Sequence, residues 1–177
     1  RKRMEKGIMI CGLNGSGKST LGSALAESLG YFFIDNEDLF FPKTDPNYLF
    51  ASPRSREEAI RLLAEAVQAH PNFVFTAVRG DYGEVVPKLY RCVIRVEVPK
   101  EIRLQRVQRR SYEKFGARML PGGDLHVQES AFFAMVAGRT EQYVAQWVAT
   151  LHCPVLRVDG TRPVAENVAF IRQELRV

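Results

Sequence analysis

The sequence has few cysteines and histidines and no long apolar run. Its 177 residues include three cysteines, Cys11, Cys92 and Cys153, and three histidines that lack the spacing of zinc ligands. Because an odd number of widely separated cysteines does not suit a disulfide framework, we expect a cytoplasmic protein in a reducing compartment. No apolar run approaches the roughly 18 residues of a membrane span, and no small-residue cleavage site follows the basic N-terminus. We therefore expect neither a membrane segment nor a signal peptide.

The excess of positive charge is confined to two segments. The chain has 25 Lys and Arg against 20 Asp and Glu, a net charge of +5. Residues 100–118 have seven basic and two acidic side chains, and residues 1–6 have four and one, which leaves 14 basic and 17 acidic among the other 152. This distribution does not suit a general nucleic-acid or membrane surface and favours a local site for a phosphorylated ligand. We expect a small-molecule partner, and a monomer or homodimer.

Short apolar runs alternate with helical patterns along the whole chain. Five runs have the Val, Ile and Phe content of strands buried on both faces, at 7–11, 31–35, 72–78, 92–98 and 154–158. Helical patterns separate or follow them, at about 21–29, 55–70, 99–110, 127–150 and from 163 onward. Such alternation is typical of βαβ units with a parallel sheet. The sequence therefore predicts one three-layer α/β domain over residues 1–177.

A glycine-rich motif lies between the first predicted strand and the first predicted helix. Residues 12–20, Gly-Leu-Asn-Gly-Ser-Gly-Lys-Ser-Thr, match the pattern G-x-x-x-x-G-K-[ST]. Glycines in such a loop adopt positive φ, so that backbone N–H groups surround phosphate oxygens at a helix N-terminus. Lys18 can then reach the β- and γ-phosphates, and the Ser19 hydroxyl can ligate Mg²⁺. The residues predicted to bind ATP here are Gly12, Asn14, Gly15, Ser16, Gly17, Lys18, Ser19 and Thr20.

With this motif in this position, the chain resembles the small P-loop kinases, the group that holds adenylate kinase, shikimate kinase and gluconate kinase. The resemblance covers nearly the whole chain. It implies a five-stranded parallel sheet in the order 2-3-1-4-5, a mobile lid at about 111–125, ATP as the phosphoryl donor and Mg²⁺ as the cofactor. A shared fold does not identify the acceptor.

Three acids follow the second predicted strand. Asp35, Glu37 and Asp38 lie where a parallel strand leaves the sheet, which is the edge at which ligands bind. The stretch resembles the strand end of shikimate and gluconate kinases, where an Asp-x-Asp holds the substrate and Mg²⁺-bound water. Asp35 matches the first acid and joins Ser19 in the predicted metal site, and either Glu37 or Asp38 matches the second. Capping of the following turn is the alternative for all three acids.

The third predicted strand ends without an acid and is followed by Arg79-Gly80-Asp81. The Asp-Gly-Phe-Pro-Arg segment of adenylate kinases is absent, which argues against an ordinary adenylate kinase, and the strand end resembles that of gluconate kinases instead. Arg79 can bind a carboxylate or phosphate of the acceptor, and snorkelling to solvent is its alternative. Asp81 either contacts the acceptor or caps the loop.

The basic segment after the fourth predicted strand has a helical pattern. Arg103, Arg106 and Arg110 fall within one arc of about 60°, whereas Ile102 and Val107 lie elsewhere and are expected to pack inward. Arg106 and Arg110 have the R-x-x-x-R spacing that resembles the helix before the lid of nucleotide kinases. There the first arginine stacks on the adenine and the second binds phosphate. A solvated basic helix face is the alternative.

Further ligand contacts are predicted in and after the lid. Arg139 resembles the arginine after the lid that meets the transferred phosphoryl group, and Arg118 is expected to contact the acceptor. Gly160 and Thr161 belong to an Asp-Gly-Thr-x-Pro turn that resembles the loop packed against adenine in nucleotide kinases. The same turn lies at the start of a predicted helix, so capping of that helix is an alternative explanation that needs no ligand contact.

These features predict an ATP- and Mg²⁺-dependent kinase for a small, anionic acceptor such as a nucleoside monophosphate or a hydroxy or sugar acid. The predicted catalytic residues are Lys18, Asp35, Asp38, Arg106, Arg110 and Arg139. The two alternatives are an ATP-binding or ATP-hydrolysing switch without a small-molecule acceptor, and a polynucleotide-end kinase. The last would use exposed aromatic side chains to stack bases, but core packing or lining of the acceptor pocket is favoured for Phe40, Phe41, Tyr48 and Phe50.

Overall fold

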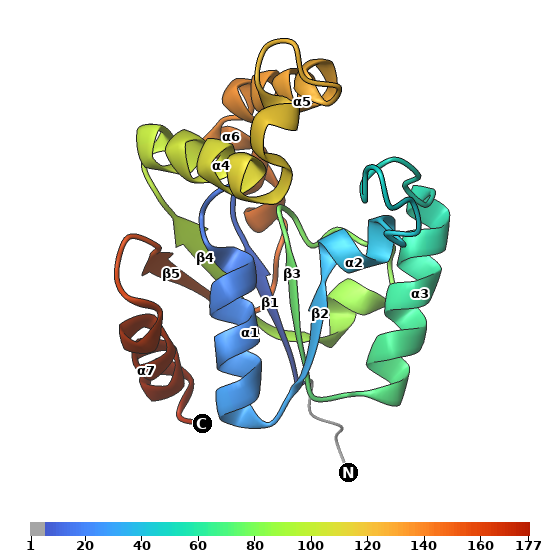
Figure 1. The fold of residues 1–177 in the computed structure, drawn as a ribbon. Helices are drawn as coiled ribbons and strands as arrows, with labels where there is room; N and C mark the ends of the chain where they lie inside the picture. The colour runs from blue at the N-terminus through green and yellow to red at the C-terminus, as the bar shows by residue number, and fades with distance from the viewer. Residues whose placement is uncertain (1–5) are drawn as a thin grey trace.

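Five parallel strands form the central sheet of the computed structural model, which describes residues 6–177 (Figure 1). The order is β2-β3-β1-β4-β5, and all four neighbouring pairs are parallel. The strands are β1 (Gly7–Cys11), β2 (Phe32–Asp35), β3 (Phe73–Ala77), β4 (Tyr90–Glu97) and β5 (Val155–Asp159). The predicted fold class and strand order are therefore confirmed. Most of the basic N-terminal segment, residues 1–5, lies outside the described residues.

Helices connect the strands and cover both faces of the sheet (Figure 1). They are α1 (Lys18–Leu29), α2 (Asn36–Phe40), α3 (Arg56–Ala69), α4 (Lys100–Phe115), α5 (His126–Gly138), α6 (Glu141–Val148) and α7 (Val164–Leu175). Short 3-10 helices are present at Val86–Leu89 and Gly116–Met119. Among these described helices, none is both long and apolar enough to span a membrane.

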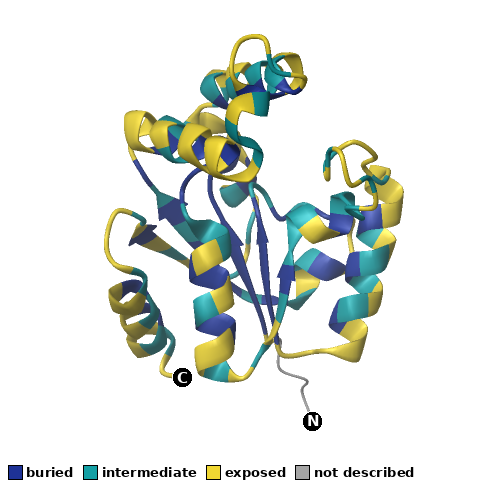
Figure 2. Cartoon of the chain, in the orientation of Figure 1, coloured by how far each residue is buried: buried dark blue, intermediate teal, exposed yellow. Residues whose placement is uncertain are grey.

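The core has one layer on each side of the sheet, because alternate residues of a strand point to opposite faces. Met9 and Cys11 pack on the side of α3 and α6, whereas Ile8 and Ile10 pack on the side of α1 and α7. Figure 2 shows the central strands β3, β1 and β4 largely buried and the outer helix faces exposed. This arrangement leaves the carboxyl ends of the strands open to ligands, with α4 and α5 above them (Figure 1).

Two helix boundaries differ from the prediction. The helix expected from 127 to 150 is divided into α5 and α6, because Arg139 and Thr140 have extended backbone conformations. The helix expected to end near Arg110 continues to Phe115 and stops at Gly116, which has a φ of +58°. The predicted lid at 111–125 thus begins inside α4 instead of in a loop. The break at Arg139 also directs this side chain toward the P-loop, as described next.

Candidate active site

The P-loop, residues 12–19, connects β1 to α1 and needs glycine at two positions. Gly15 and Gly17 have φ values of +82° and +86°, a region that other residues rarely adopt. A Cβ on Gly15 would also lie 2.4 Å from the carbonyl oxygen of Arg103. The need for glycine at position 15 therefore has two independent causes, which are its backbone conformation and the close approach of α4.

The start of α1 fits an anion. Gly17 is the N-cap and supplies no side-chain cap, so the first N–H groups of the helix have no partner from the helix itself. The neighbouring Ser16 hydroxyl is buried and has no hydrogen-bond partner within the described part of the chain. Unpaired backbone donors, an orphaned hydroxyl and the positive end of a helix dipole together suit the phosphates of a nucleotide.

Lys18 is half-buried beside the loop, and its charge is poorly solvated. The pKa of Lys18 is lowered to about 8, mainly by loss of hydration and also by the positive charges of Arg110 and Arg139, while Asp35 opposes the shift. Lys18, Asp35, Arg110 and Arg139, all predicted to be catalytic, are therefore close enough to influence one another's charge. An anionic ligand beside Lys18 would raise its pKa and favour the charged form.

Arg106 and Arg139 both bind P-loop residues. Arg106 donates hydrogen bonds to the carbonyl oxygens of Gly15 at 3.2 Å and Gly160 at 3.1 Å, which joins the P-loop to the loop after β5. Arg139 donates to the Asn14 side-chain oxygen at 3.2 Å. Arg106 precedes the predicted lid, in α4, and Arg139 follows it, after α5, so segments on both sides of the lid hold the P-loop.

Arg103 has a supporting role that helical periodicity does not suggest. It is 3% exposed and donates to the backbone oxygens of Val98 at 3.2 Å and Asn14 at 3.3 Å. Val107 is buried as expected, but the expectation that Ile102 packs inward is wrong, since it is 37% exposed. A guanidinium replaces apolar packing here because the loop beneath α4 presents backbone carbonyl groups.

The structure places Asp35 at the site and separates the two other acids. Asp35 accepts hydrogen bonds from the Thr76 hydroxyl at 3.2 Å and the Glu37 amide at 3.3 Å, so it caps α2 and also faces Lys18. Glu37 lines the same cavity, whereas Asp38 is largely exposed. Lys43 pairs with both acids, at 2.7 Å from Glu37 and 3.3 Å from Asp38. Of the two candidates for the second acid, Glu37 is the one in the cavity.

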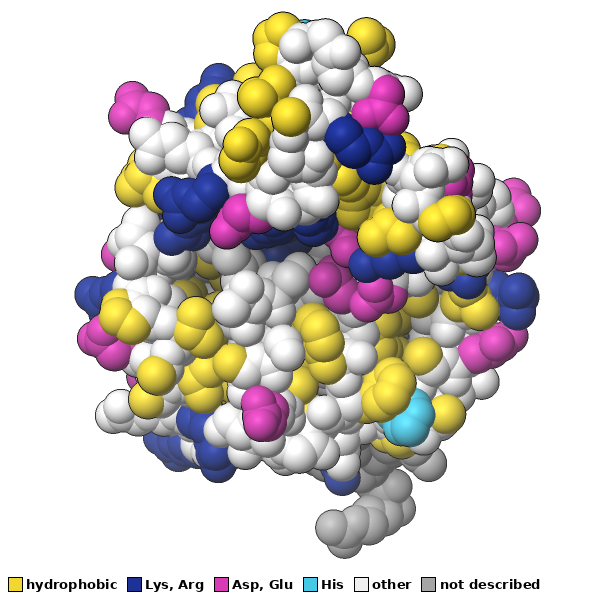
Figure 3. All heavy atoms as spheres, in the orientation of Figure 1, with side chains coloured by type: hydrophobic (Ala, Val, Ile, Leu, Met, Phe, Trp, Pro, Cys, Tyr) yellow, Lys and Arg dark blue, Asp and Glu magenta, His cyan; other side chains and the backbone are white. Residues whose placement is uncertain are grey.

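Two cavities lie on either side of the P-loop. The first, which we name the arginine cavity, has a volume of about 460 Å³ and includes the predicted Ser16, Gly17, Thr20, Arg106, Arg110, Gly160 and Thr161. Arg109, Arg162 and Asn167 line it as well and were not predicted. Gly12 does not line either cavity and donates its N–H to the Val78 carbonyl oxygen behind the loop. Figure 3 shows the hollow below α4, with Lys and Arg side chains in it and Asp and Glu side chains beside it.

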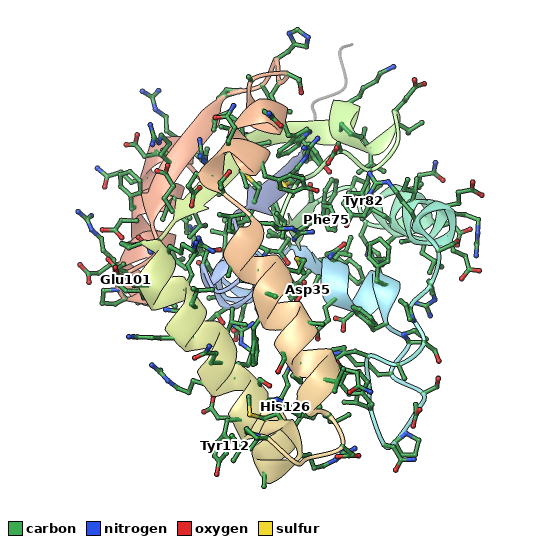
Figure 4. The ribbon with its side chains drawn as sticks, turned by 90° about the horizontal axis from the view of Figure 1, so that it is seen from above. Asp35, Phe75, Tyr82, Glu101, Tyr112 and His126 are labelled. Atoms are coloured by element: carbon green, nitrogen blue, oxygen red, sulfur yellow. The ribbon has the colours of Figure 1, made fainter. Side chains whose placement is uncertain are left out.

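The second cavity, which we name the aromatic cavity, has a volume of about 310 Å³. Asn14, Gly15, Lys18, Ser19, Asp35, Glu37 and Arg110 lie at its edge. The rest of its wall includes five aromatic rings and one acid, which are Phe41, Tyr48, Phe50, Phe115, Phe132 and Glu129. Viewed from above, α4 and α5 cross over the carboxyl ends of the strands, where Asp35 lies at the end of β2 (Figure 4). Arg110 lines both cavities, so the two meet at the P-loop.

Part of the aromatic cavity was missed by sequence reasoning. The sequence favours core packing or an acceptor pocket for Phe41, Tyr48 and Phe50, but it places Glu129 and Phe132 only within a long helix. Glu129 is 4% exposed although its sequence neighbours are Gln128 and Ser130. Because acids are rarely buried and polar residues flank this one, no local pattern marks it as part of a cavity wall.

The remaining predicted acceptor residues lie outside both cavities. Arg79 pairs with Asp81 at 2.7 Å and stacks on the Tyr143 ring at 4.7 Å. Arg118 pairs with Asp124 at 2.8 Å and donates to the Asn47 carbonyl oxygen at 2.6 Å. The guanidinium groups expected to bind an anionic acceptor are therefore paired with neighbours within the protein.

The chain is similar in sequence to several known proteins. The protein-family model described as "AAA domain" matches residues 8–120, more than half of the chain. The uncharacterized protein YqaC of Bacillus subtilis (strain 168) is 27% identical over 173 residues, which cover 93% of this chain and 94% of that protein. Shikimate kinase 2 of Yersinia enterocolitica is 51% identical over 41 residues, 23% of each chain.

Solved structures share the fold over nearly the whole chain. Deoxyadenosine kinase from M. mycoides, solved with bound dATP, has a TM-score of 0.62 at 15% identity and covers 96% of this chain and 99% of its own. Shikimate kinase from Bacteroides thetaiotaomicron has a TM-score of 0.60 at 17% identity and covers 97% and 98%. With the sequence match over residues 8–120, the chain belongs to the AAA domain family, and it shares the fold of these small P-loop kinases.

Proposed function

We propose that the protein is a phosphotransferase that moves the γ-phosphoryl group of ATP to a hydroxyl group of a small-molecule acceptor. The observation that carries this proposal is the meeting of two cavities at the P-loop, with Arg110 in both. A transferase must place two substrates in contact. A nucleotide switch without an acceptor would not need the second cavity.

The chain's own residues account for binding of the triphosphate. The N–H groups at the start of α1 and the Lys18 ammonium would hold the phosphates, and the adenosine would occupy the arginine cavity beside Gly160 and Thr161. Ser19 and Asp35 would hold Mg²⁺, which neutralises phosphate charge when bound. The described residues include no cluster of three His, Cys, Asp or Glu side chains that could hold a metal, so phosphate and water oxygens would supply its remaining ligands.

Asp35 and the arginines would act during transfer. Asp35, oriented by Thr76, is placed either to hold metal-bound water or to accept the proton that the acceptor hydroxyl loses as its oxygen bonds to phosphorus. Arg110 and Arg139, which affect the charge of Lys18, would stabilise the transferred group. The helices α4 and α5 above the site would exclude water and act as the lid.

The anionic acceptor predicted from the sequence has little support in the positions of Arg79 and Arg118, since both are paired elsewhere. The polynucleotide-end alternative is likewise weak. Phe41, Tyr48 and Phe50 line a cavity of about 310 Å³, and Phe40 packs on the core. A small-molecule acceptor is the better proposal.

The test is ADP release measured across a panel of nucleosides, nucleoside monophosphates, shikimate and gluconate, with phosphorylated product identified by mass spectrometry. We expect ADP and phosphorylated acceptor in equal amounts. ADP and inorganic phosphate formed at one rate whatever compound is added would support the hydrolytic switch and overturn the kinase proposal.

A further inference from the structure

The walls of the aromatic cavity suit a flat ring. Phe50 lies edge-to-face with Phe41 at 5.1 Å, Tyr48 at 5.7 Å and Phe115 at 6.2 Å, and Tyr48 and Phe115 are 5.4 Å apart. Phe132 completes the wall from α5. Aromatic walls stabilise planar ligands by stacking and edge contacts. They offer little to a polyhydroxylated sugar acid or to a second phosphate group.

The charges around this cavity balance. Its positive side chains are Lys18, Arg110 and Lys114, and its negative ones are Asp35, Glu37 and Glu129. Lys18 and Arg110 belong to the phosphate end. Lys114 lies 3.8 Å from Glu37 and 4.8 Å from the Phe50 ring centre. Beyond the phosphate end, Lys114 is the one cation that residues 6–177 contribute to this cavity, and it already has Glu37 and a ring beside it, so an anionic acceptor would find little counter-charge.

Glu129 is a buried acid in the wall of this cavity, next to the aromatic rings. Its Oε2 accepts a hydrogen bond from the Tyr48 hydroxyl at 2.5 Å, and its Oε1 accepts one from the Ser111 hydroxyl at 2.9 Å. No ion pair formed by residues 6–177 includes it. A carboxylate has about four acceptor positions, and burying one without a cation is costly unless further donors reach it.

We infer that the acceptor is a neutral, planar heterocycle with an N–H donor and a hydroxyl group, of which a nucleoside is the representative class. The ring lies among the aromatic side chains, and the N–H group donates to Glu129. The hydroxyl then faces Asp35 and Lys18. This inference rests on the proposed function and specifies the acceptor in it, replacing the anionic acceptor expected from the sequence.

The first test needs no variant. Adenosine and purine riboside have the same ring and ribose, but purine riboside lacks the exocyclic N–H donors. We expect adenosine or another nucleoside with an N–H donor to give a kcat/KM at least ten times that of AMP, shikimate or gluconate, and purine riboside to fall about tenfold below adenosine. A higher kcat/KM for any of the anionic compounds would overturn the inference while supporting the kinase proposal.

The second test uses Glu129→Gln, with the exposed Glu174→Gln on α7 as the matched control. The variant should raise the KM for N–H-bearing nucleosides about tenfold and reduce their advantage over purine riboside, with the Kd for ATP unchanged. Thermal unfolding reports whether the variant is folded. An unchanged ratio of adenosine to purine riboside in a folded Glu129→Gln protein would contradict a role for Glu129 in recognition.

Direct binding separates the two proposals. Calorimetry with nucleosides, in the presence of a non-hydrolysable ATP analogue, measures occupation of the aromatic cavity whether or not transfer occurs. Nucleoside binding that Glu129→Gln weakens, without any phosphorylated product, would support the acceptor assignment and overturn the kinase proposal. Absence of nucleoside binding to the wild-type protein would overturn the acceptor assignment.

Discussion

The two cavities at the P-loop are built from different parts of the chain. The arginine cavity consists of backbone groups of the P-loop and of the loop at Gly160, together with guanidinium groups from α4. The aromatic cavity consists mainly of side chains from α5, the end of α4 and the segment at 41–50. Backbone groups bind what every ATP molecule presents, whereas side chains distinguish one acceptor from another. Most substitutions should therefore weaken the binding of ATP or of the acceptor, but not of both.

Lys18 lies where the two cavities meet, and its loss should have the largest effect. Lys18→Met should reduce kcat for phosphoryl transfer by about 100-fold or more, because a charge at the developing phosphoryl group is removed. ADP release with the best acceptor measures it, and the exposed Lys88→Met is the control. Retention of more than a tenth of the wild-type rate would contradict the assignment of Lys18.

The same variant should remain folded. The pKa of Lys18 is about 8 in the folded protein against 10.5 for an ordinary lysine, so the unfolded chain binds this proton more tightly. Below pH 8 the charged lysine therefore lowers the free energy of unfolding, and replacing it should leave Tm unchanged or raise it by a few degrees. A large fall in Tm would mean that lost activity reflects unfolding.

A substitution at Arg106 should disturb the arginine cavity alone. Arg106→Gln removes a guanidinium that donates to the carbonyl oxygens of Gly15 and Gly160. We expect the Kd for ATP to rise about 30-fold, as for loss of two charge-assisted hydrogen bonds, while the acceptor KM at saturating ATP is unchanged. Arg61→Gln on the exposed face of α3 is the control. Equal weakening of ATP and acceptor would show that the two cavities are not independent.

The motif predicted the arginine cavity better than the aromatic one because its determinants are local. The P-loop pattern fixes a strand, a loop with positive φ and a helix within a dozen residues. Regular βαβ alternation predicted a parallel sheet, and the resemblance to the small P-loop kinases implied its strand order. The aromatic side chains of the other cavity come from positions up to 91 residues apart, from Phe41 to Phe132. No local pattern shows which aromatic side chains of a chain will meet.

Two details depended on tertiary contacts. Glu37 and Asp38 are adjacent on α2, and only the direction of that helix relative to β2 places Glu37 in the cavity and Asp38 in solvent. The break at Arg139 interrupts an apolar pattern that continues through it. Its contact with Asn14 lies across 125 positions of sequence, and a helical pattern contains no sign of it.

Removal of a ring should disturb the aromatic cavity alone. Phe50→Ala deletes the side chain that contacts three other rings, so the acceptor KM should rise about tenfold while the Kd for ATP stays constant. Phe170→Ala on α7, where the ring is 38% exposed, is the control for loss of an aromatic side chain. An unchanged acceptor KM would place the acceptor outside this cavity.

A change of pH should have the smallest of these effects, and it distinguishes the binding of ATP from the binding of the acceptor. ATP should bind the charged form of Lys18, whose pKa in the free protein is about 8, and binding should raise that pKa. The Kd for ATP should therefore be constant below pH 7 and rise about fourfold from pH 7 to pH 8.5.

Binding of a neutral acceptor to the nucleotide-free protein should not change over this range, because its contacts with the aromatic rings and Glu129 do not require a charged Lys18. Calorimetry at several pH values measures both constants, and Lys18→Met should abolish the dependence for ATP. If the Kd of the acceptor changes with pH as the Kd of ATP does, the acceptor also binds the charged form of Lys18. The proposal of a neutral acceptor would then be wrong, and an anionic acceptor would replace it.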